Sequence, residues 1–269
     1  MVMSGNYKLI EVNEISYFTI TQFERIPTIK HAFSTRRNGV SSLPYKSLNL
    51  GYFEKDTKEN VDKNRQLFFD AISLAGCTLV SPVQTHSDIH YEIEDTIVPP
   101  EIIADALFTR LPGIILSIQT ADCFPVIFYE PLSEIIGIVH TGWKGLINRV
   151  VQKTINALCD KYNVKPKNFI IGIGPGIQQC CYEIKEDVLE QFEKEFSFID
   201  RCIKFNHGVI SLDLLHILLH QLWELRVSHN SINWIKLCAH CNARHFFSYR
   251  REGSTGRLMT VICKTEPNK

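Results

Sequence analysis

Three apolar runs lie close together in the middle of the chain, separated only by short turn signals. They cover residues 114–118, 126–129 and 135–139. Each run is rich in β-branched or aromatic residues, which favour strands, and none of them alternates apolar with polar positions. A strand whose successive side chains are all apolar is covered on both faces. The pattern therefore predicts three central strands in a sheet region that is buried on both sides.

Longer segments with apolar residues at helical spacing lie around these strands. The spacing predicts helices over residues 58–74, 145–162, 186–196 and 212–226. Other short apolar runs predict strands over residues 7–10, 15–20, 169–173, 232–237 and 258–263, and residues 246–251 are assigned to the same sheet region. Strict βαβ alternation is absent, which predicts a mixed-sheet α/β (α+β) fold with flanking helices. We expect one domain, residues 1–269, because no linker-like segment interrupts the chain.

The charge balance argues against two classes of partner. The chain has 29 basic and 29 acidic residues, which gives no strong field for nucleic acid or a membrane surface. The segment from Met1 to Tyr7 is polar and does not resemble a secretion signal. Nine cysteines, an odd number with irregular spacing, favour reduced thiols over a disulfide framework. We expect a cytoplasmic protein with no nucleic-acid or membrane partner, and we leave its oligomeric state open.

Candidate chemistry gathers at the ends of the central strands. Asp122 and Cys123 lie between the first two runs, and His140 follows the third. Loops held by a rigid sheet are where functional residues usually lie. His86, at the polar end of another predicted strand, completes a set of two imidazoles and one thiolate. This set suits Zn²⁺ and leaves a fourth position for water or substrate, although the long spacings give no support of their own. A metal-free alternative uses Cys123 as nucleophile and His140 as its base.

Several cationic side chains are candidates for binding an anion. The guanidinium of Arg36 can grip a phosphate or carboxylate with two hydrogen bonds, although a solvated surface charge is the plain alternative. The same argument applies more weakly to Arg250 and Arg251. Lys144 lies in a glycine-flanked turn at the start of a predicted helix, where anions bind favourably.

The remaining cysteines carry a weaker metal signal. Residues 238–241 read C-A-H-C and, with His245, resemble half of a zinc module. The chain has no second C-x-x-C pair, so ordinary turn residues are the favoured interpretation there. Cys180 and Cys181 are adjacent, and we expect them to pack as apolar thiols.

The order of several short motifs resembles one known family. These motifs are Phe33-Ser34-Thr35-Arg36 with Gly39-Val40-Ser41, Leu48-Asn49-Leu50-Gly51, Gln84-Thr85-His86, Asp105-Ala106-Leu107, Thr120-Ala121-Asp122-Cys123-Phe124-Pro125-Val126, Val139-His140-Thr141-Gly142-Trp143-Lys144-Gly145, Ile173-Gly174-Pro175-Gly176-Ile177, Tyr182-Glu183-Ile184, and Phe246-Phe247-Ser248-Tyr249-Arg250-Arg251 with Gly256-Arg257. Together they resemble the YfiH/laccase-domain family, once called multicopper polyphenol oxidases. Its members are described as purine nucleoside phosphorylases and adenosine deaminases, and some bacterial ones as peptidoglycan editing factors.

The resemblance implies a YfiH-like fold and a set of site residues. The implied zinc ligands are His86, Cys123 and His140, and copper has also been associated with the family. The implied catalytic residues are Cys123, Asp122 and His140, and the implied substrate-binding residues are Arg36, Asn49 and Lys144. The chain departs from the family's His-Ala-Gly-Trp-Arg-Gly motif at Thr141 and Lys144. Lysine keeps the charge of arginine but loses its planar fork, so anion recognition is expected to differ.

The leading hypothesis is a zinc-dependent enzyme of purine nucleosides. With phosphate it would convert adenosine, inosine or methylthioadenosine to the free base and ribose 1-phosphate, and it could also deaminate adenosine. Asp122 would shuttle protons. One alternative is a Cys-His hydrolase or amidase that edits cell-wall precursors. A copper-dependent polyphenol oxidase is less favoured, because a blue-copper site uses an axial ligand such as Met and the chain has only 3 methionines. A non-enzymatic binding protein is the last alternative.

Overall fold

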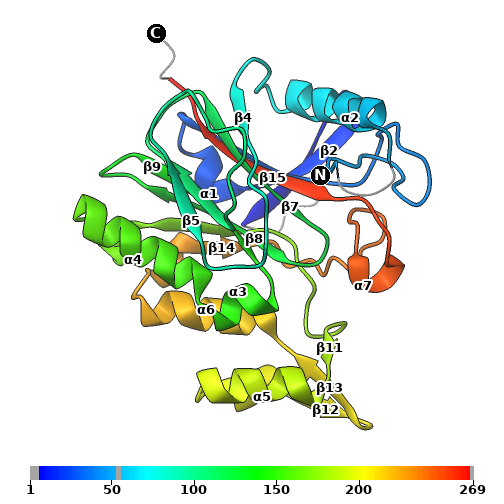
Figure 1. Cartoon of the computed structure of the whole chain (residues 1–269), viewed down its shortest axis with the longest axis vertical. Helices are drawn as coiled ribbons and strands as arrows, with labels where there is room; N and C mark the ends of the chain where they lie inside the picture. Colours follow the sequence, from blue (N-terminus) through cyan, green and yellow to red (C-terminus); the bar gives the residue numbers. More distant parts are fainter. Residues whose placement is uncertain (1–5, 53–55, 267–269) are drawn as a thin grey trace.

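Two six-stranded mixed sheets form the centre of the fold, and a three-stranded sheet lies beside them (Figure 1). The computed structural model describes residues 6–52 and 56–266, so residues 1–5, part of the segment that was compared with secretion signals, lie outside it. The first sheet has the order β1 (Tyr7–Val12), β2 (Ile15–Ile20), β3 (Ile29–Ser34), β15 (Leu258–Lys264), β7 (Ile114–Thr120) and β4 (Thr78–Val80). The second has the order β14 (Ile232–Trp234), β10 (Ile170–Ile173), β8 (Phe124–Glu130), β9 (Ile135–Thr141), β6 (Ala106–Thr109) and β5 (His90–Ile93). The third has the order β11 (Glu183–Ile184), β13 (Val209–Leu212) and β12 (Ile203–Asn206).

Helices cover the outer faces of both large sheets. The helices are α1 (Thr21–Glu24), α2 (Lys58–Ala71), α3 (Trp143–Ile147), α4 (Val150–Tyr162), α5 (Glu186–Glu195), α6 (Leu214–Glu224) and α7 (Tyr249–Glu252). The α2 helix packs on the first sheet, and α3, α4 and α6 pack on the second, so that the layers follow the order helix, sheet, sheet, helix (Figure 1). The predicted mixed α/β class with flanking helices is confirmed. Within the described ranges, no helix has both the length and the apolar character needed to cross a bilayer.

The three apolar runs form β7, β8 and β9, and the prediction that both faces of these strands are covered is confirmed. Every residue of β8 and β9 is buried. Along β8, Val126 and Phe128 point into the core under the helices, whereas Ile127 and Tyr129 point into the core between the sheets. Successive side chains of a strand alternate between faces, so an apolar run serves two cores at once. This double burial makes the strand ends a rigid support for the loops that follow.

Two sequence predictions differ from the structure. The helix expected over residues 145–162 is two helices, because Arg149 adopts a left-handed conformation (φ 56°) between α3 and α4. Residues 246–251 do not belong to a sheet: the side chain of Ser248 accepts a hydrogen bond from the Arg251 N–H and caps α7. A serine cap satisfies an amide that lacks a partner at the start of a helix, which favours helix here despite the aromatic run.

The chain crosses between the two large sheets at two places that matter for function. Residues 121–123 connect β7 of the first sheet to β8 of the second, and residues 81–89 connect β4 of the first sheet to β5 of the second. The side chain of Gln84 fastens the second crossing to the end of β7, since it exchanges two hydrogen bonds with the backbone of Gln119 (2.8 and 2.7 Å). The two crossings therefore lie side by side on one rim of the paired sheets.

Candidate metal centre and pocket

Three side chains meet at this rim in a geometry that suits a metal ion. Cys123 comes from the first crossing, His86 from the second, and His140 from β9, where it pairs with Pro125. The Sγ atom of Cys123 lies 3.9 Å from Nε2 of His86, and the two imidazole rings have centroids 4.8 Å apart. One ligand atom from each residue lies within 4.8 Å of the other two. The structure thus brings together the three ligands that the sequence proposed.

A buried carboxylate, Asp105, holds two of these ligands in place. Its Oδ1 atom lies 2.8 Å from Nδ1 of His140, which leaves the other ring nitrogen for a metal. The two oxygens of the carboxylate also accept hydrogen bonds from backbone N–H groups: Oδ2 from Thr85 and Ser87 (3.2 and 2.6 Å) and Oδ1 from His86 (3.1 Å). These bonds stabilise a turn in which His86 has a positive φ of 58°. Carboxylates in this position behind metal-bound histidines orient the ring and raise its basicity.

Asp105 lies in one of the family motifs, but the sequence pattern did not indicate a role for it. The available signal was an acidic residue next to the apolar positions Ala104, Ala106 and Leu107. Acidic residues are almost never fully buried unless they are paired, so a charge in such a run points to a partner. The partner itself was not predictable, because His140 reaches Asp105 only through the pairing of β6 with β9.

The electrostatics of the site favour a thiolate. Burial raises the pKa of Cys123, but the nearby charge of His140 and hydrogen bonds from both histidines outweigh it and lower the pKa to about 6. Burial lowers the pKa of His140, but Cys123 and Asp105 outweigh it and raise the pKa to about 9. Burial also raises the pKa of Asp105, yet its hydrogen bonds to His140 and Ser87 hold it well below its usual range. A thiolate with two imidazoles is a donor set for zinc or copper.

The space around the thiol also fits a bound ion. A Cβ atom on Gly142 would lie 2.7 Å from Sγ of Cys123, closer than van der Waals contact allows. Glycine at this position therefore leaves the thiol free to face the two histidines. The three residues fit a metal ion with three protein ligands and an open position, which is the pattern of catalytic rather than structural zinc.

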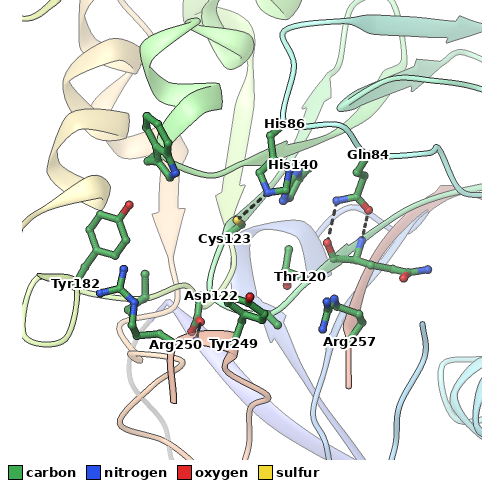
Figure 2. Close-up of a pocket in the computed structure, with 14 residues that line it drawn as sticks. Gln84, His86, Thr120, Asp122, Cys123, His140, Tyr182, Tyr249, Arg250 and Arg257 are labelled. Carbon is green, nitrogen blue, oxygen red and sulfur yellow. Dashed lines mark hydrogen bonds between the residues drawn. The ribbon is translucent and has the colours of Figure 1, made fainter. Parts of the chain in front are cut away.

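The three ligands lie in the wall of a pocket with a volume of about 540 Å³. This volume is in the range of roughly 300–1,000 Å³ that is usual for small-molecule sites. Figure 2 shows Tyr182 and Arg250 on one side of Cys123, and Gln84 and Arg257 on the other. The residues that line the pocket are Gln84, His86, Gln119, Thr120, Ala121, Asp122, Cys123, His140, Trp143, Ile177, Tyr182, Tyr249, Arg250 and Arg257. The pocket combines flat aromatic surfaces with two guanidinium groups beside the candidate metal centre.

Asp122 connects the metal ligand beside it to the loops that form the rest of the pocket. Its Oδ2 atom accepts a hydrogen bond from the backbone N–H of Arg250 (2.7 Å), and its carbonyl accepts one from Ile177 (2.8 Å). Asp122 has a positive φ of 99°, which these contacts sustain. Burial raises the pKa of its carboxyl group, and the hydrogen bond from Arg250 only partly offsets this effect.

The three predicted substrate-binding residues are not among the residues that line this pocket. Arg36 donates to the carbonyl of Lys46 (3.1 and 2.9 Å), pairs with Glu252 (2.5 Å) and lies over the ring of Phe247. These contacts use its donors to hold neighbouring loops together.

Asn49 and Lys144 are placed differently from Arg36. Asn49 is buried and accepts a hydrogen bond from the backbone N–H of Arg257 (2.9 Å), so it positions a residue that does line the pocket. Lys144 is exposed, with Nζ 5.5 Å from the centre of the Trp143 ring. The substrate-binding roles of Arg36, Asn49 and Lys144 stay predictions.

The other cationic candidates separate clearly. Arg250 lines the pocket, as its weaker sequence argument allowed, and its Nη1 donates to the carbonyl of Glu183 (2.7 Å). Arg251 does not line the pocket and donates to the carbonyls of Ala239 and His240. Arg257, Tyr182 and Tyr249 lie in motifs of the family resemblance, but the sequence assigned them no role, because a single arginine or tyrosine is common on any surface. Their positions in the pocket depend on the order of the strands in the sheets, which the sequence does not show.

Comparison with known proteins agrees with the fold. Residues 30–265 match the family model described as multi-copper polyphenol oxidoreductase laccase. A protein of Bacteroides thetaiotaomicron named purine nucleoside phosphorylase is 31% identical over 245 residues, covering 87% of this chain and 91% of the relative. A protein of the same name from Deinococcus radiodurans is 33% identical over 236 residues, covering 87% of this chain and 88% of the relative. The crystal structure of the hypothetical protein YfiH of Bacillus licheniformis has a TM-score of 0.87 at 27% identity, covering 94% of this chain and 100% of that one. The chain therefore belongs to the YfiH-like, multi-copper polyphenol oxidoreductase laccase family.

Proposed function

We propose that this protein is a zinc-dependent purine nucleoside phosphorylase. The observation that carries the proposal is the pocket, in which His86, Cys123 and His140 lie between two guanidinium groups and several aromatic rings. The names of the relatives from Bacteroides thetaiotaomicron and Deinococcus radiodurans support the same reaction class. The proposed substrates are adenosine, inosine and methylthioadenosine, together with phosphate.

Different side chains of the pocket would bind different parts of the substrate. Arg250, on the Tyr182 side of Cys123, would bind phosphate, because a guanidinium pairs with two phosphate oxygens at once. The rings of Tyr182, Tyr249 and Trp143 offer flat apolar surfaces to the purine. Zn²⁺ held by His86, Cys123 and His140 would supply a positive charge that activates an oxygen ligand at neutral pH. The donors thus hold the anion and the sugar–base bond in one cavity.

The reaction breaks one bond and forms another. A phosphate oxygen attacks C1′ of the ribose, the bond from C1′ to the purine nitrogen breaks, and the purine leaves with the electron pair. A proton given to the purine makes it a better leaving group. Asp122 is the acid that we assign to this step, because its half-buried carboxyl lies in the pocket wall. Adenosine deamination, in which water adds at C6 and the amino group leaves as ammonia, would use the same pocket without phosphate.

The proposal is tested with zinc-loaded protein and inosine, with and without phosphate. We expect release of hypoxanthine and formation of ribose 1-phosphate only when phosphate is present. Cys123→Ala should abolish the activity together with zinc binding at this site. Cys159→Ala is the matched control, since Cys159 lies in α4 and packs against the helical core. No turnover by fully zinc-loaded protein with phosphate and a panel of purine nucleosides would contradict the proposal.

A Cys-His hydrolase is the second candidate, and one observation favours it. Asp105, His140 and Cys123 stand in the order of an acid–base–nucleophile triad, with 2.8 Å between Asp105 and the histidine. In this reading His140 takes the thiol proton, Cys123 attacks a carbonyl carbon, and the amine leaves with the proton from His140; water then cleaves the thioester and frees Cys123. The two candidates differ in their response to metal. If amide hydrolysis is fastest in metal-free protein and is lost when iodoacetamide alkylates Cys123, the hydrolase replaces the phosphorylase.

A further inference from the structure

A second cluster of metal-ligand side chains lies next to the pocket and takes no part in the reaction proposed above. Cys180 and Cys181 come from the loop between β10 and β11, and Cys238 and Cys241 come from the loop between β14 and α7. The four Sγ atoms all lie within 4.8 Å of one another. The sequence predicted turn and packing residues here because it showed only one C-x-x-C pair. The fold supplies the second pair.

The sulfur–sulfur distances are close to those of a tetrahedral zinc site and somewhat shorter. Sγ of Cys241 lies 3.6 Å from that of Cys180 and 3.2 Å from that of Cys181, and the sulfurs of Cys180 and Cys181 are 3.6 Å apart. Four thiolates around Zn²⁺, each about 2.3 Å from the metal, would have sulfur–sulfur distances of about 3.8 Å. A disulfide requires about 2.05 Å, so these thiols are not bonded to one another. Small shifts of the thiols would close the tetrahedron.

Backbone donors prepare the most buried of the four thiols to carry negative charge. The N–H of Gln178 donates to Sγ of Cys238 (3.4 Å). The backbone N–H of Cys241 also donates to this sulfur. Thiolates, not thiols, are the metal ligands. Packing alone would not require amide donors directed at a sulfur.

The loop that carries Cys238 and Cys241 is held in a compact form around the cluster. Arg251 donates to the carbonyls of Ala239 and His240, and Asn242 donates to the carbonyl of Cys238 through both its side chain (2.8 Å) and its backbone (3.1 Å). The guanidinium also brings a positive charge to a loop that would surround four thiolates. A site with two metal ligands three positions apart in such a turn follows the usual spacing of structural zinc.

We infer that Cys180, Cys181, Cys238 and Cys241 form a structural Zn²⁺ site that fastens together two walls of the pocket. The first loop carries Ile177 and Tyr182 of the pocket, and the second leads directly into α7, which carries Tyr249 and Arg250. The two loops already touch, since the N–H of Ala239 donates to the carbonyl of Gly176 (2.9 Å). Four protein ligands close the coordination shell, so this zinc would bind no substrate. Its role would be to hold Tyr182 and Arg250 at a set distance.

Metal analysis of the full-length protein tests the inference independently of the proposed reaction. We expect about two zinc ions per chain in the wild type and in Cys159→Ala, and about one in Cys123→Ala, which leaves the four-cysteine cluster intact. Adding Cys241→Ser to Cys123→Ala should remove the remaining ion. Cobalt bound to Cys123→Ala should show the strong sulfur-to-metal charge-transfer absorption of several thiolate ligands. Fewer than one metal ion in Cys123→Ala, or iron in place of zinc, would overturn the zinc assignment.

Thiol labelling gives a second measurement that needs no variant of the cluster. Cys180 and Cys241 are exposed, so iodoacetamide should modify them readily in chelator-treated protein and slowly in zinc-loaded protein, as shown by peptide mass spectrometry. Equal labelling in both forms would refute the site. A disulfide between Cys181 and Cys241 in protein purified from the cell in the absence of oxidant would refute it as well. Failure of the phosphorylase assay alone would leave both measurements unaffected.

Discussion

Replacing Asp105 by asparagine removes one charge from the site and changes almost nothing in its shape. Oδ1 of Asp105 accepts from His140 and from the N–H of His86, and Oδ2 accepts from the N–H and the hydroxyl of Ser87. Whichever oxygen becomes an NH₂ group, at least two donors then face another donor. Hydrogen bonds to a charged group contribute about 1.5–3 kcal/mol each, and the easier burial of a neutral amide offsets part of the loss. We expect the free energy of unfolding to fall by about 3 kcal/mol.

The same substitution should weaken the metal site. Without the carboxylate, His140 loses the partner that fixes its orientation, and the turn that carries His86 loses its acceptor. Changes at such partners of metal-bound histidines typically lower metal affinity by about 10–100-fold. The free energy is measured by urea unfolding of chelator-treated protein, and the affinity by competition with a chromogenic zinc chelator.

Asp88→Asn is the control for this prediction. Asp88 follows the same turn but is 38% exposed at its side chain and pairs with Lys153 at the surface. Surface pairs contribute about 0–1 kcal/mol, so this variant should remain close to the wild type in both measurements. If Asp105→Asn also matches the wild type in stability and zinc affinity, the role that we assign to Asp105 is wrong.

Three further predictions concern the pocket and the core. Gly142→Ala should displace the thiol of Cys123 and lower zinc affinity, because the added Cβ would lie 2.7 Å from Sγ. The fold should stay intact, since Gly142 has a negative φ (−97°) that alanine can adopt. Unchanged zinc affinity in the chelator competition would contradict this prediction. Arg250→Gln should raise KM for phosphate about tenfold or more and leave the zinc content unchanged, as steady-state kinetics and metal analysis would show. Burial lowers the pKa of His31 from 6.5 to about 4, with Glu24 opposing this effect. Since the folded state favours neutral His31, its contribution is complete above pH 6.5 and is lost as the pH falls to about 4. The loss amounts to about 3 kcal/mol. The free energy of unfolding of His31→Gln, measured with urea, should therefore change less between pH 6.5 and 4 than that of the wild type. Equal pH dependence of the two proteins would refute this prediction.

The sequence was informative wherever local pattern decides structure. Uninterrupted apolar runs identified β7, β8 and β9, since a strand with two buried faces consists mainly of apolar residues. Helical spacing identified α2, α5 and α6. The same patterns misplaced residues 246–251, where one hydroxyl of Ser248 caps a helix and outweighs a run of aromatic side chains.

The identities of the three metal-ligand candidates came from the sequence, but their meeting depends on the fold. Cys123, His140 and His86 were singled out because acid, thiol and imidazole groups stood at strand ends. Their distances follow from two crossings between the sheets, and no periodicity along the chain reports where such crossings lie.

Only the tertiary structure showed what surrounds each of these groups. Arg36 has the chemistry of an anion clamp, yet its donors go to the carbonyl of Lys46 and to Glu252. Cys180 and Cys181 looked like packing residues until the fold placed them beside Cys238 and Cys241. A residue type determines which bonds a side chain can make, whereas the partners that are within reach depend on segments far away in the chain. For this protein the sequence by itself determined the central strands, the helices α2, α5 and α6, and the candidate ligands His86, Cys123 and His140, and the packing of two sheets decided which side chains could share a metal.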